Sequence, residues 1–247
     1  MKIATWNVNG IRARQDQVRE WLERDRPDVV CLQELKAEPN QIPEQLQLGD
    51  YHTYWHGRKG YSGVSLHVLK SHWAAAPAFS HPDFDMESRI VQVDLGDVIV
   101  ASVYVPNGGK DYPAKLAFMQ RLASWSQRVH AEGRTLVICG DLNITRTDRD
   151  VHPKERKPGA VGQRPEERAL LEELLEGRLV DVGRALDPEN DGLFTWWAPW
   201  RNLRARNIGW RLDYVLASMA LAERAASCEV QTAVGTSDHA PVVMTTT

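Results

Sequence analysis

The chain has 247 residues, of which 43% are hydrophobic and 26% are charged, a composition that excludes a disordered or low-complexity protein. Lysine and arginine number 30 against 33 aspartates and glutamates, so the formal net charge is −3 and a nucleic acid could be held only by local patches. No Pro- or Ser-rich linker divides the sequence, which predicts a single domain over residues 1–247.

Short apolar strands alternate with amphipathic helices. The first two thirds predict strands over Lys2–Val8, Asp28–Gln33, Tyr51–His56, Gly63–Leu69, Arg89–Leu95, Val98–Val105 and Thr135–Cys139, with helices over Gln15–Asp25, after the N-cap residue Asp111, and over Pro165–Glu176. Further strands are predicted over Leu193–Trp197, Trp210–Leu216, Cys228–Val234 and Pro241–Thr245. This mixture predicts an α/β protein with two sheets packed face to face and helices outside.

The segment Asp148–Pro165 has no apolar periodicity and predicts a long loop. A solvated surface loop and a loop that touches a ligand are equally compatible with it. Cys31, Cys139 and Cys228 are far apart and are predicted to be free, mostly buried thiols. Met1–Gly10 has no basic-then-apolar signal pattern, and no apolar run approaches the ~18 residues of a membrane span. We therefore expect a cytoplasmic protein without a membrane partner.

Polar side chains occur where predicted strands end. They are Asn7, Glu34, Tyr104, Asn107, Asp141, Asn143, Asp213, Asp238 and His239. Each of them alone is explained by a turn or by solvation. Because strand ends meet at one edge of a sheet, we expect the whole set to converge in one cleft.

These residue types fit metal-assisted hydrolysis of a phosphate ester. Carboxylate and amide oxygens, such as those of Glu34 and Asn7, favour Mg²⁺ or Mn²⁺ over Zn²⁺. Tyr104, Asn107, Asn143 and His239 could donate to phosphate oxygens. A carboxylate beside the imidazole would fix its tautomer and favour its cation. Neither a glycine-rich phosphate loop nor a Gly-x-Ser-x-Gly elbow is present.

Five sequence blocks in order resemble the signatures of the exonuclease III family of apurinic/apyrimidinic (AP) endonucleases. They begin at Thr5 (TWNVNGIRA), Cys31 (CLQELK), Gly140 (GDLNI), Gly209 (GWRLDY) and Ser237 (SDHAPV). The resemblance implies a DNase I-like four-layered α/β sandwich, with two packed mixed β-sheets flanked by helices. It also implies cleavage of the phosphodiester on the 5′ side of an abasic site in double-stranded DNA, leaving a 3′-hydroxyl. Trimming of blocked 3′ ends is a related expectation, and the enzyme is expected to be a monomer.

The resemblance also assigns roles to residues. Glu34 would be the main Mg²⁺ ligand, with Asn7 and Asp238 beside it. Asp141 would orient or deprotonate the attacking water, and Asn143 would help it. Tyr104 and Asn107 would bind the phosphate. His239 would contact a phosphate oxygen, and Asp213 would hold the His239 ring. Whether Asp141 or His239 is the base stays open at this point. Some relatives carry Asp where this chain has Asn9, which favours one tightly held Mg²⁺ over two.

Aromatic and arginine residues are concentrated just before the fourth block and at its start. Trp196, Trp197, Trp200 and Trp210 lie within fifteen residues, accompanied by Arg201, Arg204, Arg206 and Arg211. Core packing explains one or two of the indoles, but arginine interleaved with tryptophan is typical of a nucleic-acid surface. An extruded abasic sugar would fit a small apolar pocket, which the resemblance assigns to Trp196, Trp210 and Leu212. It places Trp200 where relatives wedge a residue into the duplex, and Arg211 is predicted to bind substrate.

Two other functions share this pattern in part. Inositol-phosphate phosphatases and sphingomyelinases have the same fold and site, but they lack the Trp–Arg segment and the Gly-Trp-Arg-Leu-Asp-Tyr block. A non-catalytic nucleic-acid-binding descendant should have lost its charged site residues, which are all present here. The remaining histidines show no metal-ligand spacing with an acidic residue and are predicted to be surface or packing residues: His52, His56, His67, His72, His81, His130 and His152.

Overall fold

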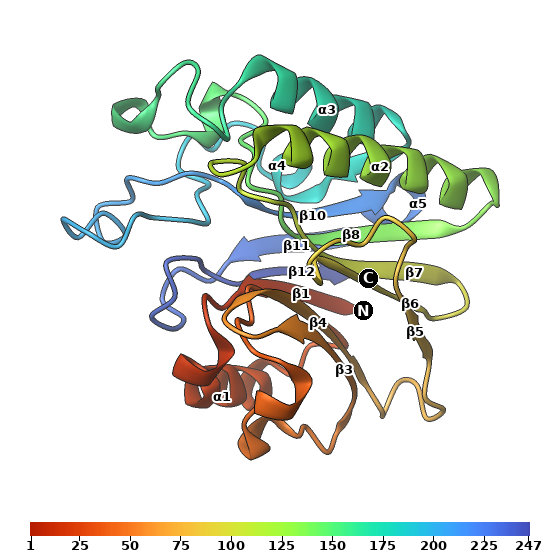
Figure 1. Cartoon of the computed structure of the whole chain (residues 1–247). Helices are drawn as coiled ribbons and strands as arrows, with labels where there is room; N and C mark the ends of the chain where they lie inside the picture. The colour runs from red at the N-terminus through yellow and green to blue at the C-terminus, as the bar shows by residue number, and fades with distance from the viewer.

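The computed structural model describes residues 1–247 and shows two six-stranded sheets packed face to face, with helices on their outer faces (Figure 1). The predicted four-layered α/β sandwich is confirmed. No helix combines the length and the hydropathy that a membrane-spanning segment requires.

The first sheet has the strand order β11-β12-β1-β2-β4-β3 and the second β5-β6-β7-β8-β10-β9. The strands of the first sheet are β1 (Lys2–Asn7), β2 (Val29–Gln33), β3 (Tyr51–Arg58), β4 (Tyr61–Leu69), β11 (Ala225–Val230) and β12 (Val242–Thr246). Those of the second are β5 (Ala78–Ser80), β6 (Ile90–Asp94), β7 (Val98–Tyr104), β8 (Thr135–Asp141), β9 (Leu179–Asp181) and β10 (Asp213–Ser218). Both sheets are mixed, because β1 pairs parallel with β2 and β7 with β8 while the other pairs are antiparallel.

The longer helices cover the outer faces of the two sheets (Figure 1). The α-helices are α1 (Gln15–Asp25), α2 (Tyr112–Ala131), α3 (Pro165–Glu176), α4 (Val182–Leu186) and α5 (Met219–Ala222). Short 3₁₀ turns are η1 (Ile11–Ala13), η2 (Pro39–Gln41), η3 (Glu44–Leu46), η4 (Asp148–Asp150) and η5 (Pro153–Glu155). Asp111 caps α2 as predicted, its carboxylate accepting the Ala114 amide at 3.0 Å.

Strand β2 shows how the core is divided. All of its side chains are buried, and they alternate between two apolar layers. Val29 and Cys31 pack in the layer between the sheets, whereas Val30 and Leu32 pack in the layer under α1. A buried side chain of this kind contributes about 1.5–3 kcal/mol of hydrophobic stabilisation. A third apolar layer lies under α2 and α3.

Strand register brings the ends of the central strands to one edge of the sandwich. In the first sheet Asn7 stands opposite Gln33, one residue before Glu34. In the second sheet Asp141 stands opposite both Tyr104 and Asp213. Polar residues that are far apart in the sequence therefore leave their sheets at neighbouring points.

The predicted helices and strands agree best with the structure where apolar residues alternate or repeat regularly. Helix α1 has the predicted limits, and α3 begins and ends where expected. The strand predicted over Leu193–Trp197 is wrong, because Trp196 forms only isolated bridges to Trp210 and His239. Strand β10 begins at Asp213 and not at Trp210. The predicted strand Cys228–Val234 is shifted, because β11 runs from Ala225 to Val230 and turns follow it. The cysteines are free, as expected.

Gly140 lets β8 fit between β7 and β10, and its replacement tests this packing. Its φ is +149°, and a Cβ there would lie 1.8 Å from the Val103 carbonyl oxygen. We expect Gly140→Ala to lower the free energy of unfolding by more than about 3 kcal/mol, because backbone atoms have to move. Gly60→Ala is the control, since Gly60 has a φ of +70° but no atom near its Cβ position. It should cost only about 1 kcal/mol. Equal losses in urea denaturation would contradict the steric explanation.

Candidate active site

A cavity of about 390 Å³ opens at the edge where β1, β2, β7 and β8 end. Its lining consists of Glu34, Tyr104, Asn107, Asp141, Asn143, Val161, Trp196, Trp210, Leu212, Asp238 and His239. Residues from both sheets and from the long loops thus share one cavity. The predicted convergence of strand ends is what the structure shows.

Asn7 lies buried beneath this cavity and joins two carboxylates. Its Nδ2 donates to Glu34 Oε2 at 3.0 Å and to Asp141 Oδ2 at 2.9 Å. Its own Oδ1 accepts the Asn9 amide at 3.0 Å. Because Asn7 and Glu34 belong to the first sheet and Asp141 to the second, one amide group fixes the two sheets against each other at the site.

The backbone turns sharply where the polar residues leave the strands. Asn9, Glu34, Lys36 and Asn143 all have positive φ, at 45°, 57°, 53° and 52°. Left-handed backbone is unfavourable for side chains such as Glu and Lys, and strain of this kind is characteristic of functional sites. Here it occurs within three residues of the ends of β1, β2 and β8, where Glu34 and Asn143 line the cavity and Asn9 and Lys36 contact the carboxylates of Asp238 and Glu34.

Asp141 and Asn143 form a rigid turn after β8. Asp141 Oδ1 accepts the Asn143 amide at 2.9 Å, and Asn143 Nδ2 donates to the Val105 carbonyl at 2.9 Å. Asn107 Nδ2 in turn donates to Asn143 Oδ1 at 3.2 Å. The Asp-x-Asn spacing therefore has a structural reason: the first side chain holds the backbone that presents the second.

His239 lies between two buried carboxylates. Its Nδ1 lies 2.8 Å from Asp213 Oδ2, and its Nε2 lies 3.8 Å from Asp141 Oδ2. Thr195 supports Asp213, because its hydroxyl donates to Asp213 Oδ2 at 2.6 Å and accepts the amides of Leu212 and Asp213. Burial alone would lower the pKa of His239, but the charges of Asp213 and Asp141 raise it to about 10. The imidazole is therefore a cation at neutral pH.

The pKa of Asp141 is raised toward 7. Burial, with the Asp213 charge, raises it to about 7 against the opposing charge of His239 and the hydrogen bonds from Asn143 and Asn7. Burial and the neighbouring charges of Glu34 and Asp141 raise the pKa of Tyr104 well above its usual value, so its hydroxyl keeps its proton. The cavity thus combines an acid–base group that titrates near pH 7 with two groups that remain proton donors.

Lys36 and Asn9 complete the polar rim. Lys36 Nζ lies 2.7 Å from Glu34 Oε1 and 2.6 Å from Asn9 Oδ1. Asn9 Nδ2 donates to Asp238 Oδ1 at 2.7 Å, and Trp196 Nε1 donates to Asp238 Oδ2 at 3.0 Å. Burial would raise the pKa of Asp238, but the His239 charge and these two hydrogen bonds lower it. Even with Lys36 and cationic His239 counted, the carboxylates of the site outnumber its cations.

One wall of the cavity, next to His239 and Asp238, is aromatic. The indoles of Trp196 and Trp210 meet edge to face, with ring centroids 5.6 Å apart. Leu212 and Val161 stand beside them. Gly162 passes directly under Trp210, since a Cβ there would lie 3.0 Å from Cζ3 of that ring. Part of the loop predicted over Asp148–Pro165 therefore forms a wall of the cavity and is not simply a solvated surface loop.

Comparisons with known proteins agree with this geometry. A family model described as the Endonuclease/Exonuclease/phosphatase family matches residues 4–239. The chain belongs to this family. Within it, the chain is 32% identical to the exodeoxyribonuclease of Bacillus subtilis (strain 168), with 98% of each chain covered. Among solved structures it is similar to an AP endonuclease from Archaeoglobus fulgidus, with a TM-score of 0.89, 31% identity, and 100% of this chain and 99% of that one covered. It is also similar to the 3′ phosphatase NExo from Neisseria bound to a product DNA hairpin, with a TM-score of 0.91, 29% identity and the same coverage.

Two residues predicted to bind substrate lie outside the cavity. Trp200 is exposed over 60% of its surface and stands on the turns before β10. Arg211 is buried, and its guanidinium binds Asp150 Oδ1 at 2.7 Å and both oxygens of Asp181 at 2.7 Å. With its donors held inside the protein, Arg211 cannot reach a phosphate, so the prediction that it binds substrate is wrong.

Four residues of the site are not among those that the sequence predicts. Lys36, Thr195, Val161 and Gly162 are not at strand ends of the predicted kind, and their roles depend on contacts between distant segments. Lys36 follows Glu34 closely enough that an ion pair could have been predicted from the spacing. For Thr195 and Gly162 the sequence offers no such clue.

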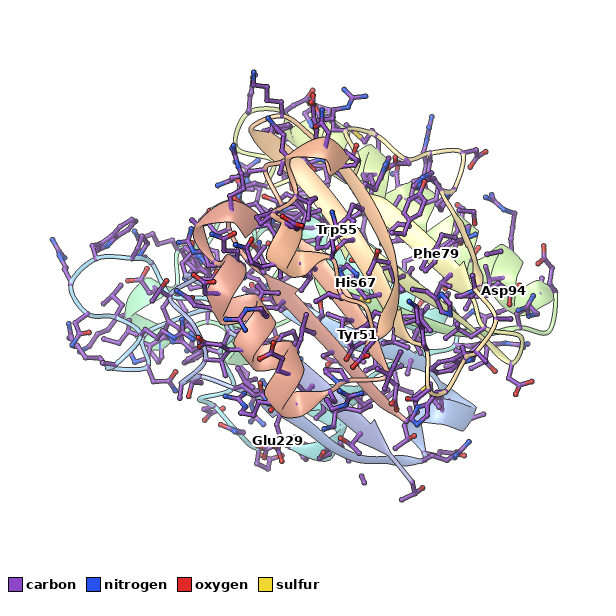
Figure 2. The ribbon with its side chains drawn as sticks, turned by 90° about the horizontal axis from the view of Figure 1, so that it is seen from below. Tyr51, Trp55, His67, Phe79, Asp94 and Glu229 are labelled. Atoms are coloured by element: carbon purple, nitrogen blue, oxygen red, sulfur yellow. The ribbon has the colours of Figure 1, made fainter.

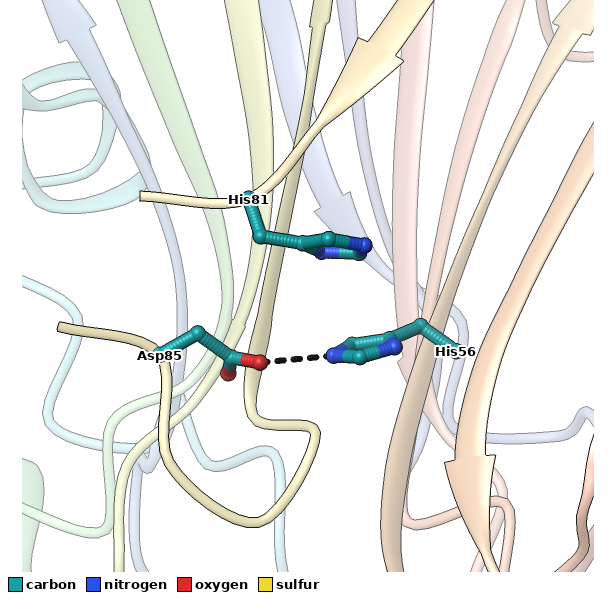
Figure 3. A group of neighbouring side chains, drawn as sticks. All are labelled: His56, His81 and Asp85. Carbon is teal, nitrogen blue, oxygen red and sulfur yellow. Dashed lines mark hydrogen bonds and ion pairs between the residues drawn. The ribbon is translucent and has the colours of Figure 1, made fainter. Parts of the chain in front are cut away.

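A second His–Asp group lies outside this cavity (Figure 3). His56 Nε2 lies 2.7 Å from Asp85 Oδ2, and the rings of His56 and His81 stack with centroids 3.9 Å apart. Both ring nitrogens of His81 have partners, the Tyr54 hydroxyl at 2.8 Å and the Ile90 carbonyl at 3.2 Å. Because lone pairs of stacked rings do not converge on one ion, we regard the group as a polar contact between the edge of the first sheet and the segment before β6. Packing roles were predicted for these histidines, but the sequence did not reveal that Asp85 is the partner of His56.

The protonation of His239 can be measured directly. In the metal-free protein, NMR of the ring nitrogens should show an imidazolium that persists above pH 8, because Asp213 and Asp141 hold the charge. Asp213→Asn should lower the midpoint by more than about one pKa unit. Asp238→Asn makes the same change of charge but removes no hydrogen bond to the ring, so it should have a smaller effect.

The raised pKa of His239 also makes stability depend on pH. Its contribution is complete below the unfolded-state pKa of about 6.5 and is lost as the pH rises toward about 10. The loss of stability between pH 6.5 and about 10 should be smaller in Asp213→Asn. A titration midpoint of His239 near pH 6.5 in the wild type, or equal shifts of this midpoint in Asp213→Asn and Asp238→Asn, would contradict the proposed electrostatic origin of the raised pKa.

Proposed function

We propose that this protein is a Mg²⁺-dependent AP endonuclease of DNA base-excision repair. It would hydrolyse the phosphodiester on the 5′ side of an abasic site and leave a 3′-hydroxyl. The observation that carries the proposal is that one cavity joins the carboxylates of Glu34 and Asp141, the cation of His239 and the indole wall of Trp196 and Trp210. A phosphate and a bare sugar can occupy such a cavity together.

The buried charges divide the work between Asp141 and His239. Asp141, whose pKa is about 7, can accept the proton of the attacking water near neutral pH. His239 stays protonated to about pH 10, so it acts as a donor to a phosphate oxygen and not as the base. Tyr104 and the exposed Asn107 supply further donors around the same phosphate. Asn143, whose Nδ2 already donates to the Val105 carbonyl and to Asp141 Oδ2, accepts from Asn107 and holds it beside Asp141.

The donor set fits a hard divalent cation. Glu34, Asn7 and Asp238 offer the carboxylate and amide oxygens that Mg²⁺ prefers, and Mn²⁺ could substitute for it. The excess of carboxylates over cations gives the cavity the charge that such an ion would balance. When bound, Mg²⁺ would polarise the scissile phosphate as a Lewis acid. Asn7 keeps Glu34 and Asp141 together from below, which preserves the spacing between the ion-binding and water-activating groups.

The aromatic wall supports an abasic substrate. Trp196, Trp210 and Leu212 form an apolar surface next to His239, where a sugar without its base could lie flat. Trp200 stands exposed on the neighbouring turn, as a residue that wedges into the duplex would. We infer that the same site trims blocked 3′ ends, because a 3′ terminus also presents a phosphate without a continuing strand. The likeness to the 3′ phosphatase NExo supports this side activity.

The two competing functions fit the structure less well. A lipid or inositol phosphatase has no use for the paired indoles beside the phosphate donors. A non-catalytic binder would have no reason to retain buried charges such as Asp141 and Asp213, which are costly without a reaction that needs them.

Cleavage of a labelled abasic duplex tests the proposed function. With Mg²⁺ we expect a single incision that leaves a 3′-hydroxyl, and none with EDTA. Asp141→Asn should lower the rate by at least about 1,000-fold, because the base is lost while the shape is kept. Asp97→Asn, on the exposed turn between β6 and β7, should cleave like the wild type. Hydrolysis of a phosphoinositide but not of the duplex, or binding without incision, would support one of the competing functions.

Substrate discrimination tests the aromatic wall. We expect Trp210→Ala to lower the ratio of abasic to intact duplex cleavage by about 10- to 100-fold, since stacking on one indole contributes about 1–3 kcal/mol. Trp55→Ala is the matched control, because Trp55 is also half-buried and packs edge to face on a ring, His67, at 4.5 Å (Figure 2). If cleavage of both substrates fell equally in Trp210→Ala while its melting temperature dropped, the pocket assignment would be wrong.

A further inference from the structure

A buried ion pair lies beneath the cavity and takes no direct part in the proposed reaction. Lys115 on α2 and Glu167 on α3 bind each other, and both are completely buried. Neither side chain lines the cavity. Burial lowers the pKa of Lys115 against the opposing charge of Glu167, as expected of an ammonium removed from water. A pair placed so deep requires an explanation from its other contacts.

The remaining donors of Lys115 hold the two asparagines of the phosphate site. Its Nζ donates to the backbone carbonyl of Asn143 at 2.7 Å and to that of Asn107 at 3.2 Å. An ammonium has three donors, and Glu167 takes the third. The loops after β7 and β8 are thus tied to one charge, and the side chains that they present are hydrogen-bonded to each other.

The carboxylate of Glu167 binds the backbone of Gly162, on which the Trp210 ring packs. Both of its oxygens accept the Gly162 amide, at 2.8 and 3.0 Å. The Gly162 carbonyl accepts the amide and the hydroxyl of Thr145, each at 2.8 Å. A Cβ on Gly162 would lie 3.0 Å from the Trp210 ring and 3.2 Å from the Asn143 carbonyl. Any movement of Gly162 therefore moves the surface on which Trp210 rests.

We propose that Lys115 and Glu167 are positioning residues that set the two asparagines of the phosphate site and the Trp210 wall in one fixed arrangement. The proposal rests on the function proposed above. Through its ammonium the pair fixes Asn107 and Asn143, and through its carboxylate it fixes Gly162 under Trp210. The distance between the phosphate donors and the indole wall is then determined by a contact of two charges.

Stability alone does not account for the pair. Replacing a buried ion pair by apolar side chains of similar size is often neutral or stabilising, because the desolvation cost of both charges disappears. What apolar side chains cannot supply is a set of directional bonds to three backbone groups on the two loops after β7 and β8. The pair is therefore expected to influence catalytic geometry more than folding.

The double variant Lys115→Met/Glu167→Leu tests the proposal. Steady-state cleavage of the abasic duplex, well below the melting temperature, should show kcat reduced about 100-fold, with KM changed by less than about threefold. The ratio of abasic to intact cleavage should also fall. The control is Arg146→Met/Glu172→Leu, which removes another ion pair between the β8 loop and α3, at 2.7 Å, without touching the cavity. Its kcat should stay within about threefold of the wild type.

A second variant covers the case in which the double variant fails to fold. Glu167→Gln removes the charge that pairs with Lys115 and puts an NH2 group in place of one of the two oxygens that accept the Gly162 amide, so a donor faces a donor there. We expect a fall in kcat of at least about tenfold, and a shift of the Trp210 indole N–H resonance that Arg146→Met/Glu172→Leu does not produce. The indole resonance is measured without DNA, so this result does not depend on whether the protein cleaves an abasic duplex. A wild-type protein that does not cut abasic DNA would thus overturn the proposed function, whereas unchanged kcat and an unchanged resonance in Glu167→Gln would overturn the positioning role.

Discussion

The site depends first on one amide group that spans the two sheets. Asn7 donates from the end of β1 to Glu34 on its own sheet and to Asp141 on the other. In the neighbouring interior, Gln33 accepts from the Thr5 hydroxyl and donates to Ser102 of the second sheet, each at 3.1 Å, beside the apolar layer between the sheets. Apolar layers can slide at little cost, but a buried hydrogen bond is lost when its atoms separate. These polar contacts therefore fix the offset of the sheets at the edge where the chemistry would occur.

The same bridge concentrates negative charge. Holding Glu34 and Asp141 together, with Asp213 nearby, would be unfavourable in a dry interior unless cations balanced them. His239 supplies part of that balance and is kept charged by it, because the charges of Asp213 and Asp141 outweigh the effect of burial on its pKa, whereas burial and the Asp213 charge raise the pKa of Asp141. The remaining excess favours an external cation. Metal affinity, the protonation of His239 and the basicity of Asp141 are thus properties of one charge distribution.

The sequence predicts the parts of the site that follow from strand periodicity. Asn7, Glu34 and Asp141 come directly at or after buried strands, and parallel pairing carries them to one edge. Arg211 has the same local surroundings as a DNA-contacting arginine, but Asp150 and Asp181 approach from segments 61 and 30 residues away and bury it. Contacts of this kind depend on how loops fold back over the sheet. Hydrophobic spacing within a window of a few turns contains no information about them.

Buried charge also explains how the two long loops are held. The segments after β8 and before β10 extend from one end of the sandwich (Figure 1), and a loop that must offer polar groups to DNA cannot be secured mainly by apolar packing. Arg211 joins the second loop to the first through Asp150 and to β9 through Asp181, while Lys115 and Glu167 join the first loop to α2 and α3. An ion pair of this kind adds little net stability, but it permits few alternative geometries. The arginine that is lost as a DNA contact therefore serves the site in another way, because it holds in place the backbone directly after Trp210.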